Sequence, residues 1–178
     1  MRSENSSQGL IAVLTGMDSL SYGESAGERM TLGLLLHDPE EEHDCFSDNT
    51  HNSHYYDVIG IQNVYLGRYK RIDVTIMQGP SPADFVKITD AVTDGRMRSS
   101  LAAAVEAFAA IVTRAELVEA YDQMIGEGNE VGNKFVQTGI DALLNQTKKT
   151  RRFITALRLK PMQFEGSDNL DDPSKLAQ

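Results

Sequence analysis

The sequence predicts an all-α protein built as an up-and-down helical bundle, and three observations support this. Apolar residues recur three or four positions apart along most of the chain, whereas Val, Ile and Thr do not gather in alternating runs. The connections between the amphipathic segments are short, which favours antiparallel neighbouring helices. About 40% of the 178 residues are hydrophobic, which is enough for a core.

The amino-terminal region is expected to hold two helices. Residues 8–17 carry apolar side chains at the spacing i, i+4, i+7. Asp18 or Ser19 is then a candidate N-cap for a second helix that reaches about Leu36. Pro39 should end this helix, because proline disfavours helical backbone in the residue before it.

A third helix is expected over residues 54–69, followed by an ambiguous stretch at 73–79. The apolar face of this helix is predicted from the spacing i, i+3, i+7, i+11. Its members are Val58, Ile61, Tyr65 and Tyr69. The stretch after it suits a short extended segment.

The second half of the chain predicts four more helices. Pro82 suits the first turn of a helix that reaches about Val92. An alanine-rich helix should follow Gly95, and a shorter helix should carry residues 117–125. The last long helix should span residues 130–157. The domain organisation expected is a disordered leader at 1–8, a helical domain at 9–160 and a polar tail at 161–178.

The composition excludes some classes of function. Lys and Arg number 17 and Asp and Glu number 26, so the net charge is −9, and such a chain repels nucleic-acid phosphates. The single cysteine, Cys45, permits no internal disulfide. No apolar run approaches the roughly 20 residues of a transmembrane span, so neither nucleic-acid binding nor a transmembrane span is expected.

The polar stretch between residues 38 and 53, DPEEEHDCFSDNTHNS, is the densest group of reactive side chains. It contains His43 and His51, and His54 follows directly, so three of the four histidines lie within twelve residues. Imidazoles and carboxylates together suit iron or zinc. His51 and His54 are three apart, so one helical turn could direct both to one point. The spacing matches no established ligand pattern, and the alternative is a solvated acidic loop that caps the next helix.

A second group comprises Glu24, Glu28 and Arg29. Glu24 and Glu28 are four apart and would share one face of an α-helix, which is unfavourable unless a cation or an arginine intervenes. Arg29 could pair with a carboxylate elsewhere. The alternative is an ordinary exposed helix face.

Two strings in the chain resemble the second half of imelysin-like proteins. They are SYGESAGERM from residue 21 and DPEEEHDCFSDNTHNSHYYDVIGIQNVYLGRY from residue 38. This family includes iron-regulated protein A-like and insulin-cleaving metalloproteinase-like members. The resemblance covers most of the chain outside its ends. It implies a fold of two helical halves around a shared site, of which this chain is the carboxyl-terminal half.

The resemblance also implies site residues, a compartment and a metal. The positions that match the family's helix motif and loop motif are Glu24, Glu28, Arg29, His43, Ser47, Asp48, Asn49 and His51. Both groups are expected to approach the interface between the halves, with His43 and His51 as candidate metal ligands and iron, or zinc, as the metal. The implied location is periplasmic or associated with the outer membrane.

The resemblance leaves peptidase activity open. Family members are often labelled metallopeptidases on the basis of a Gly-x-His-x-x-Glu motif, which this sequence does not contain. The expected function is therefore binding of iron or a small iron-bearing ligand, with the site completed by an N-terminal half of the same protein or by self-association. The alternatives are a metallopeptidase half-domain and a non-catalytic structural or interaction module of a surface lipoprotein.

Overall fold

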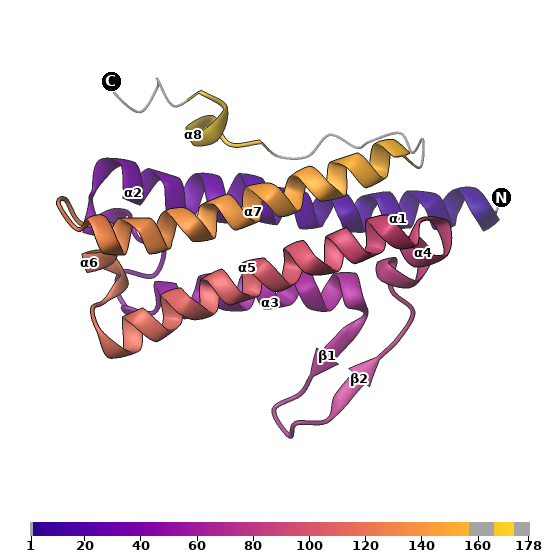
Figure 1. Cartoon of the computed structure of the whole chain (residues 1–178), viewed down its shortest axis with the longest axis horizontal. Coiled ribbons are helices and arrows are strands. Elements are labelled where there is room, and N and C mark those ends of the chain that lie inside the picture. Colours follow the sequence, from indigo (N-terminus) through magenta and orange to yellow (C-terminus); the bar gives the residue numbers. More distant parts are fainter. Residues whose placement is uncertain (1, 157–165, 173–178) are drawn as a thin grey trace.

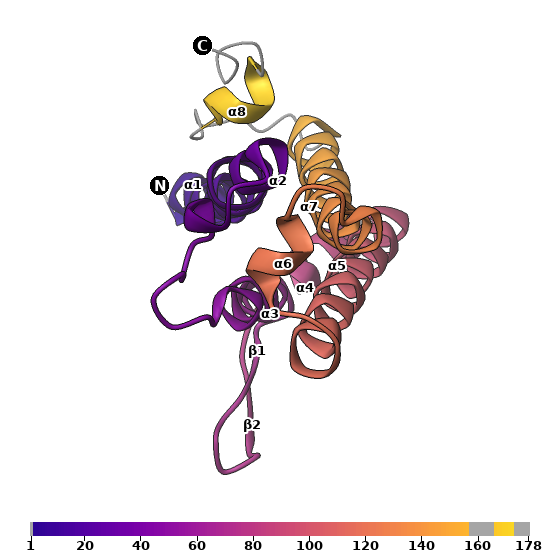
Figure 2. The ribbon, with the colours of Figure 1, turned by 90° about the vertical axis from the view of Figure 1, so that its left-hand side faces the viewer.

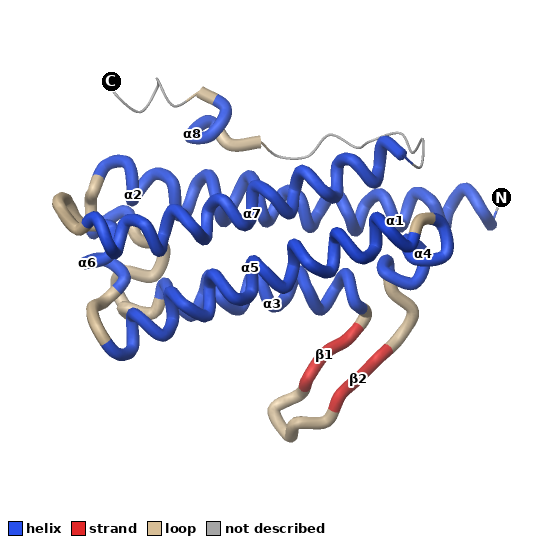
Figure 3. The backbone as a smooth tube through the Cα atoms, in the orientation of Figure 1, coloured by secondary structure: helices blue, strands red, loops and turns tan. Residues whose placement is uncertain are grey.

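The computed structural model describes residues 2–156 and 166–172 and confirms an all-α helical bundle (Figures 1 and 3). The elements are α1 (Arg2–Asp18), η1 (Ser19–Thr31), α2 (Leu32–Leu36), η2 (Pro39–Glu41), α3 (Thr50–Leu66), β1 (Arg68–Lys70), β2 (Ile76–Gln78), α4 (Pro82–Thr89), α5 (Ala91–Leu117), α6 (Tyr121–Ile125), α7 (Glu130–Ala156) and α8 (Asp168–Asp171). Long helices run side by side along the molecule, and the short β1–β2 hairpin stands away from them.

The first long helix is continuous from α1 through η1 to α2. The expected break at Asp18 does not occur, because Asp18 has helical backbone angles and makes no capping hydrogen bond. The middle section, η1, is a π-helix of 13 residues, a rare form in which hydrogen bonds join residues five apart. The helix also begins at Arg2, so residues 2–8 are helical and not the expected disordered leader. It ends at Leu36, as expected, and His37 takes a left-handed conformation.

Helix α3 begins and ends earlier than the apolar spacing indicated. It starts at Thr50, four residues before the expected start at His54, and Gly67 ends it in a left-handed conformation with φ of 61°. A Cβ atom on Gly67 would lie 2.7 Å from the carbonyl oxygen of Gly79, so the chain turns sharply there. Tyr69, expected on the buried face, therefore lies in β1 and is exposed.

Short polar side chains set the starts of α4 and α5, because they accept hydrogen bonds from backbone N–H groups there. Ser81 and Asp84 form a reciprocal capping box at the start of α4. The side chain of Asp90 accepts hydrogen bonds from the backbone of Val92 and Thr93, so α5 begins at Ala91. The expected helix boundary at Gly95 is therefore wrong, and Gly95 lies inside α5.

Two groups of buried apolar side chains fill the bundle. The group nearer α6 joins η1, α5 and α7 through residues such as Met30, Phe108 and Ile140. The group nearer the hairpin contains Leu14 and Tyr65, packed with α5 and α7. The packing brings η1 alongside α3, and the site described below forms between these two elements (Figure 2).

The carboxyl-terminal residues 166–172 lie against η1 through the short helix α8. They belong to the segment 161–178 that was expected to be a polar tail. The remaining residues of that segment, 161–165 and 173–178, lie outside the described part of the chain.

Candidate functional site

The π-helix brings Glu24 and Arg29 together, since they are five residues apart. Arg29 Nη2 lies 3.4 Å from Glu24 Oε2. Arg29 Nη1 donates a hydrogen bond of 2.9 Å to Asp57 Oδ2 on α3. The guanidinium group therefore lies between two carboxylates and connects η1 to α3 through Asp57, which agrees with the expectation that Arg29 pairs with a carboxylate elsewhere.

Glu28 does not join this group, which corrects the expectation that it shares a face with Glu24. Its carboxylate accepts hydrogen bonds from Ser167 Oγ at 2.7 Å and from Asn169 Nδ2 at 3.3 Å. In Figure 2, α8 lies on the side of the first helix that faces away from α3. The expectation rested on sequence spacing alone, whereas the Glu28 carboxylate turns to the segment around α8 and the Glu24 carboxylate turns to Arg29.

An open pocket of about 550 Å³ lies between η1, the polar loop and the first turns of α3. Its lining residues are Arg29, His43, Asp44, Asn49, Asn52, Ser53, Tyr56 and Asp57. The backbone N–H of Asp44 donates to Thr50 Oγ1 at 2.9 Å. Ser53 Oγ donates to the Asp44 carboxylate. These two bonds attach the loop to α3 and hold Asp44 at the pocket wall.

Two of the five predicted loop residues, His43 and Asn49, line this pocket. Asn49 Oδ1 accepts a hydrogen bond of 2.9 Å from Asn52 Nδ2. The other three, Ser47, Asp48 and His51, are not among the lining residues. Ser47 is exposed and donates to the carbonyl of Asp44, and Asp48 is exposed in a left-handed conformation. His51 is half-buried, with Nε2 at 3.1 Å from Asn52 Nδ2.

His54 lies behind the pocket and is fully buried. Its ring stacks on His43 with a centroid separation of 6.1 Å and meets Tyr121 edge-on at 5.6 Å. Neither ring nitrogen has a hydrogen-bond partner among the described residues. Burial, with smaller contributions from the nearby His43 and Arg29, lowers the pKa of His54 to about 3. The His54 ring is therefore neutral at neutral pH.

Glu42 and Tyr121 add further buried polar groups beneath the pocket. Burial raises the pKa of the Glu42 carboxyl, although a hydrogen bond with Thr50 opposes this shift. Burial also raises the pKa of the Tyr121 hydroxyl, and the charge of Glu42 adds to that effect. Glu42 Oε2 and the Tyr121 hydroxyl have no partner in the described part of the chain. Unpaired buried polar atoms of this kind are usual contact points for water or an ion.

Sequence patterns overlooked Asp57 and considered His54 only as a possible partner of His51, although a signal for each was present. His54 extends the buried face of α3 by one turn, since the buried residues follow the spacing i, i+4, i+7, i+11. They are His54, Val58, Ile61 and Tyr65. Asp57 is a carboxylate on α3, and such a group can pair with an arginine on any helix that packs against α3.

The donors around the pocket suit iron chemically but form an incomplete set. His43, Asp44 and Asp57 offer an imidazole and two carboxylates, and burial raises the pKa of the Asp57 carboxyl while Arg29 opposes that shift. Within residues 2–156 and 166–172, no three or more His, Cys, Asp or Glu side chains are grouped as a metal site requires. A metal at this position would therefore take further ligands from a bound molecule or from another segment.

Comparison with known sequences agrees with the helical fold. The sequence model of the imelysin family, peptidase family M75, matches residues 1–150. A comparison with curated proteins finds no match. Members of the family are envelope proteins and are associated with metals in general. In residues 2–156 and 166–172, no helix has the length and hydropathy needed to cross a membrane. Since the match spans most of a chain that folds as a helical bundle, this protein belongs to the imelysin family.

Proposed function

We propose that this chain is a cell-envelope protein linked to iron uptake, and that it binds iron or a small iron-bearing ligand in the pocket between η1 and α3. The observation that carries the proposal is the meeting of Arg29, His43, Asp44 and Asp57 around one open pocket. These side chains come from three separate segments of the chain, so their meeting is a product of the fold.

The pocket suits an iron-bearing ligand better than a bare ion. Its volume of about 550 Å³ falls in the range of small-molecule sites. His43 and Asp44 offer metal ligands, while Arg29 offers N–H donors that suit the carboxylates of an iron chelate. Further ligands would come from the chelate itself and from an N-terminal half of the same protein or a second copy of the chain.

Calorimetric titration of ferrous iron, zinc and ferric citrate into the chain tests this proposal. We expect binding that weakens about tenfold or more in His43→Gln and in Asp57→Asn, because each removes a donor at the pocket wall. Glu40→Gln is the matched control, since Glu40 is an exposed carboxylate of the same loop that does not line the pocket. Absence of heat with all three titrants, or equal affinity in all variants, would contradict the proposal.

The proposed location is the periplasm or the periplasmic side of the outer membrane. Its support is the family's association with the envelope. Fractionation of the native cells, with detection by an antibody against this chain, tests it. Recovery of the protein in the cytosolic fraction alone would contradict the location without affecting the titration result.

A further inference from the structure

The β1–β2 hairpin projects from the bundle (Figures 1 and 3). Apolar side chains at its tip are exposed. Ile72 is fully exposed and Val74 is 67% exposed. Tyr69, Ile76 and Met77 on the two strands are about half exposed. Five large apolar residues therefore face solvent within nine positions, although turns ordinarily carry polar residues or glycine.

The tip holds one of these apolar residues in a strained conformation. Val74 has φ of 61°, a left-handed conformation that strongly disfavours a β-branched side chain. The turn is held by hydrogen bonds from Val74 N to the Arg71 carbonyl at 3.0 Å and from Arg71 N to the Thr75 carbonyl at 2.9 Å. Asp73 also accepts from Thr75 N at 3.0 Å. Strain at a residue that is 67% exposed suggests a contact outside the chain.

The hairpin is positively charged, unlike the rest of the protein. Between residues 68 and 78 it carries Arg68, Lys70 and Arg71 against Asp73, a net charge of 3 − 1 = +2. The whole chain carries −9, so the other residues carry −9 − 2 = −11. The charge that surrounds the exposed apolar tip is therefore suited to an anionic partner.

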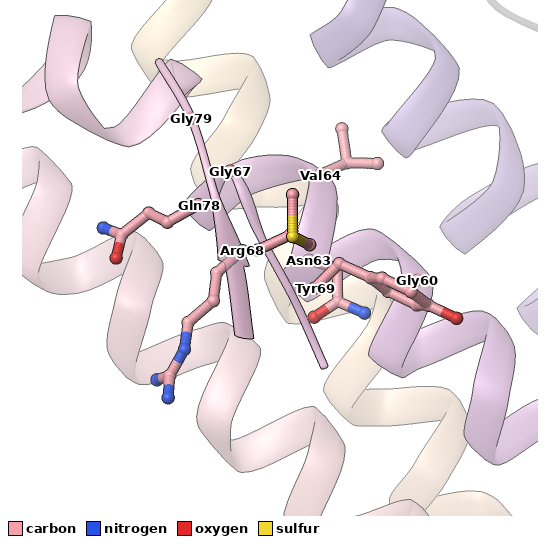
Figure 4. Close-up of a pocket in the computed structure, with 9 residues that line it drawn as sticks. Gly60, Asn63, Val64, Gly67, Arg68, Tyr69, Gln78 and Gly79 are labelled. Carbon is pink, nitrogen blue, oxygen red and sulfur yellow. The ribbon is translucent and has the colours of Figure 1, made fainter. Parts of the chain in front are cut away.

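The exposed apolar surface of the hairpin extends toward α3. Tyr69 pairs with Met77 across the strands, and both line an open groove of about 460 Å³ with Gly60 and Val64 of α3. Arg68 also borders this groove, and Figure 4 shows the Tyr69 and Arg68 side chains pointing in different directions. Exposed apolar side chains thus extend from the tip toward α3, and basic side chains lie among them.

We propose that the hairpin is a membrane-contact element that inserts Ile72 and Val74 into the interface of an anionic lipid surface. Arg68, Lys70 and Arg71 would lie against the headgroups, where each basic residue adds to the attraction. A convex tip with no surrounding rim enters a deformable lipid interface readily, whereas a protein partner would need a matching cavity. A bilayer also accepts isolated apolar side chains without the ordering of a matching protein surface.

The absence of tryptophan from the sequence permits a direct test. In Ile72→Trp, the single indole should shift its fluorescence to shorter wavelength on addition of vesicles of phosphatidylcholine with phosphatidylglycerol. Brominated lipid should quench it, and vesicles of phosphatidylcholine alone should produce a much smaller change. Leu117→Trp is the matched control, since Leu117 is 77% exposed at the end of α5, outside the hairpin. An Ile72→Trp spectrum that does not respond to anionic vesicles would overturn the proposal.

Vesicle sedimentation of variants without the introduced tryptophan separates insertion of the apolar tip from electrostatic attraction to the lipid surface. The double variant Ile72→Ser with Val74→Asn should reduce the partition coefficient at least tenfold, and Asn tolerates the left-handed position, so the turn is retained. Lys70→Gln should reduce it about fivefold. Leu117→Ser should match the natural sequence.

Two results of the sedimentation experiment would reject a lipid partner. The first is a tip variant that binds anionic vesicles as tightly as the natural sequence does. The second is a tip variant that changes only the sedimentation coefficient of the free protein, which would assign the hairpin to contacts between copies of the chain.

Discussion

The first long helix has two faces with different surroundings: one borders an open pocket, and the other is covered by the segment around α8. The face toward α3 presents Arg29 to an open pocket, and Glu24 forms an ion pair with Arg29. The opposite face presents Tyr22, Gly27 and Glu28 to the segment around α8, which binds all three. Residues five apart, Glu24 with Arg29 and Tyr22 with Gly27, stay together because the helix between them is a π-helix. One face is left open for a ligand, and the other is covered by the chain itself.

Two buried ionisable groups, one behind the pocket and one beside α7, respond to pH in opposite directions. His54, behind the pocket, is held neutral because burial lowers its pKa to about 3. Asp18 lies beside α7, and burial raises its pKa to about 7, although Thr150 and Arg151 oppose this shift. The pocket side should therefore lose stability on acidification, and the α7 side on alkalinisation.

The largest expected effect concerns His54. Its pKa falls from 6.5 in the unfolded chain to about 3 in the fold, so the folded protein excludes a proton that the unfolded chain binds. The stability from this group is fully present above pH 6.5 and is lost as the pH falls toward 3, by up to about 5 kcal/mol. In His54→Phe this component should be absent. Urea unfolding of both proteins between pH 7 and pH 4 measures the difference.

His43→Gln serves as the control for that measurement. His43 is exposed, so its replacement leaves the burial of His54 in place and should preserve most of the acid sensitivity. If His54→Phe lost stability on acidification as steeply as the natural sequence, the neutral state assigned to His54 would be wrong.

The next effect is slightly smaller and opposite in sign. The pKa of Asp18 rises from 3.8 to about 7, so the folded protein holds a proton that the unfolded chain has released. The stability from this group is complete below pH 3.8 and is lost as the pH rises through 7, by up to about 4 kcal/mol. Asp18→Asn should therefore be more stable than the natural sequence at pH 8 and should differ little at pH 4.

Asp141→Asn is the matched control for Asp18→Asn, since Asp141 is an exposed aspartate of α7. Thermal unfolding of both variants at the two pH values tests the comparison. An Asp18→Asn variant no more stable than the natural sequence at pH 8 would show that Asp18 is not held protonated.

The helices were predictable from sequence wherever a periodic apolar face or a capping side chain marks them. The helix predicted over residues 130–157 matches α7, and the end of the first helix at Leu36 was also correct. Errors occurred where a local interaction overrides the pattern. Asp90 starts α5 before Gly95, and the left-handed Gly67 ends α3 before Tyr69. Both residue types are recognised helix boundaries, so these two errors were avoidable.

The site was less predictable because its geometry depends on features that spacing does not encode. Spacing alone does not say which neighbour a side chain turns to, so the hydrogen bonds of Glu28 with Ser167 and Asn169 were not predicted. The loop has no period at all, and its turns decide that His43 and Asn49 line the pocket while Ser47 does not. Asp57 could be paired with Arg29 only after α3 and η1 were known to pack together.

The smallest expected effect concerns the covered face and the contact between Gly27 and Ser167. A Cβ atom on Gly27 would lie 2.1 Å from Ser167 Oγ, so Gly27→Ala should displace residues 166–172 from η1. The loss involves a few hydrogen bonds, each contributing about 1 kcal/mol, and the higher helix propensity of alanine partly offsets it. Hydrogen exchange at residues 166–172 is therefore the sensitive measurement, and it should become faster while exchange in α3 stays unchanged.

Gly16→Ala is the control for this variant, because Gly16 lies on the same long helix with no atom within 4 Å of an added Cβ. It should leave the exchange of residues 166–172 as it is. Equal protection of that segment in Gly27→Ala and Gly16→Ala would mean that the segment does not depend on close contact with Gly27. The covered face would then depend on the hydrogen bonds of Tyr22 and Glu28 with this segment, and not on the absence of a side chain at Gly27.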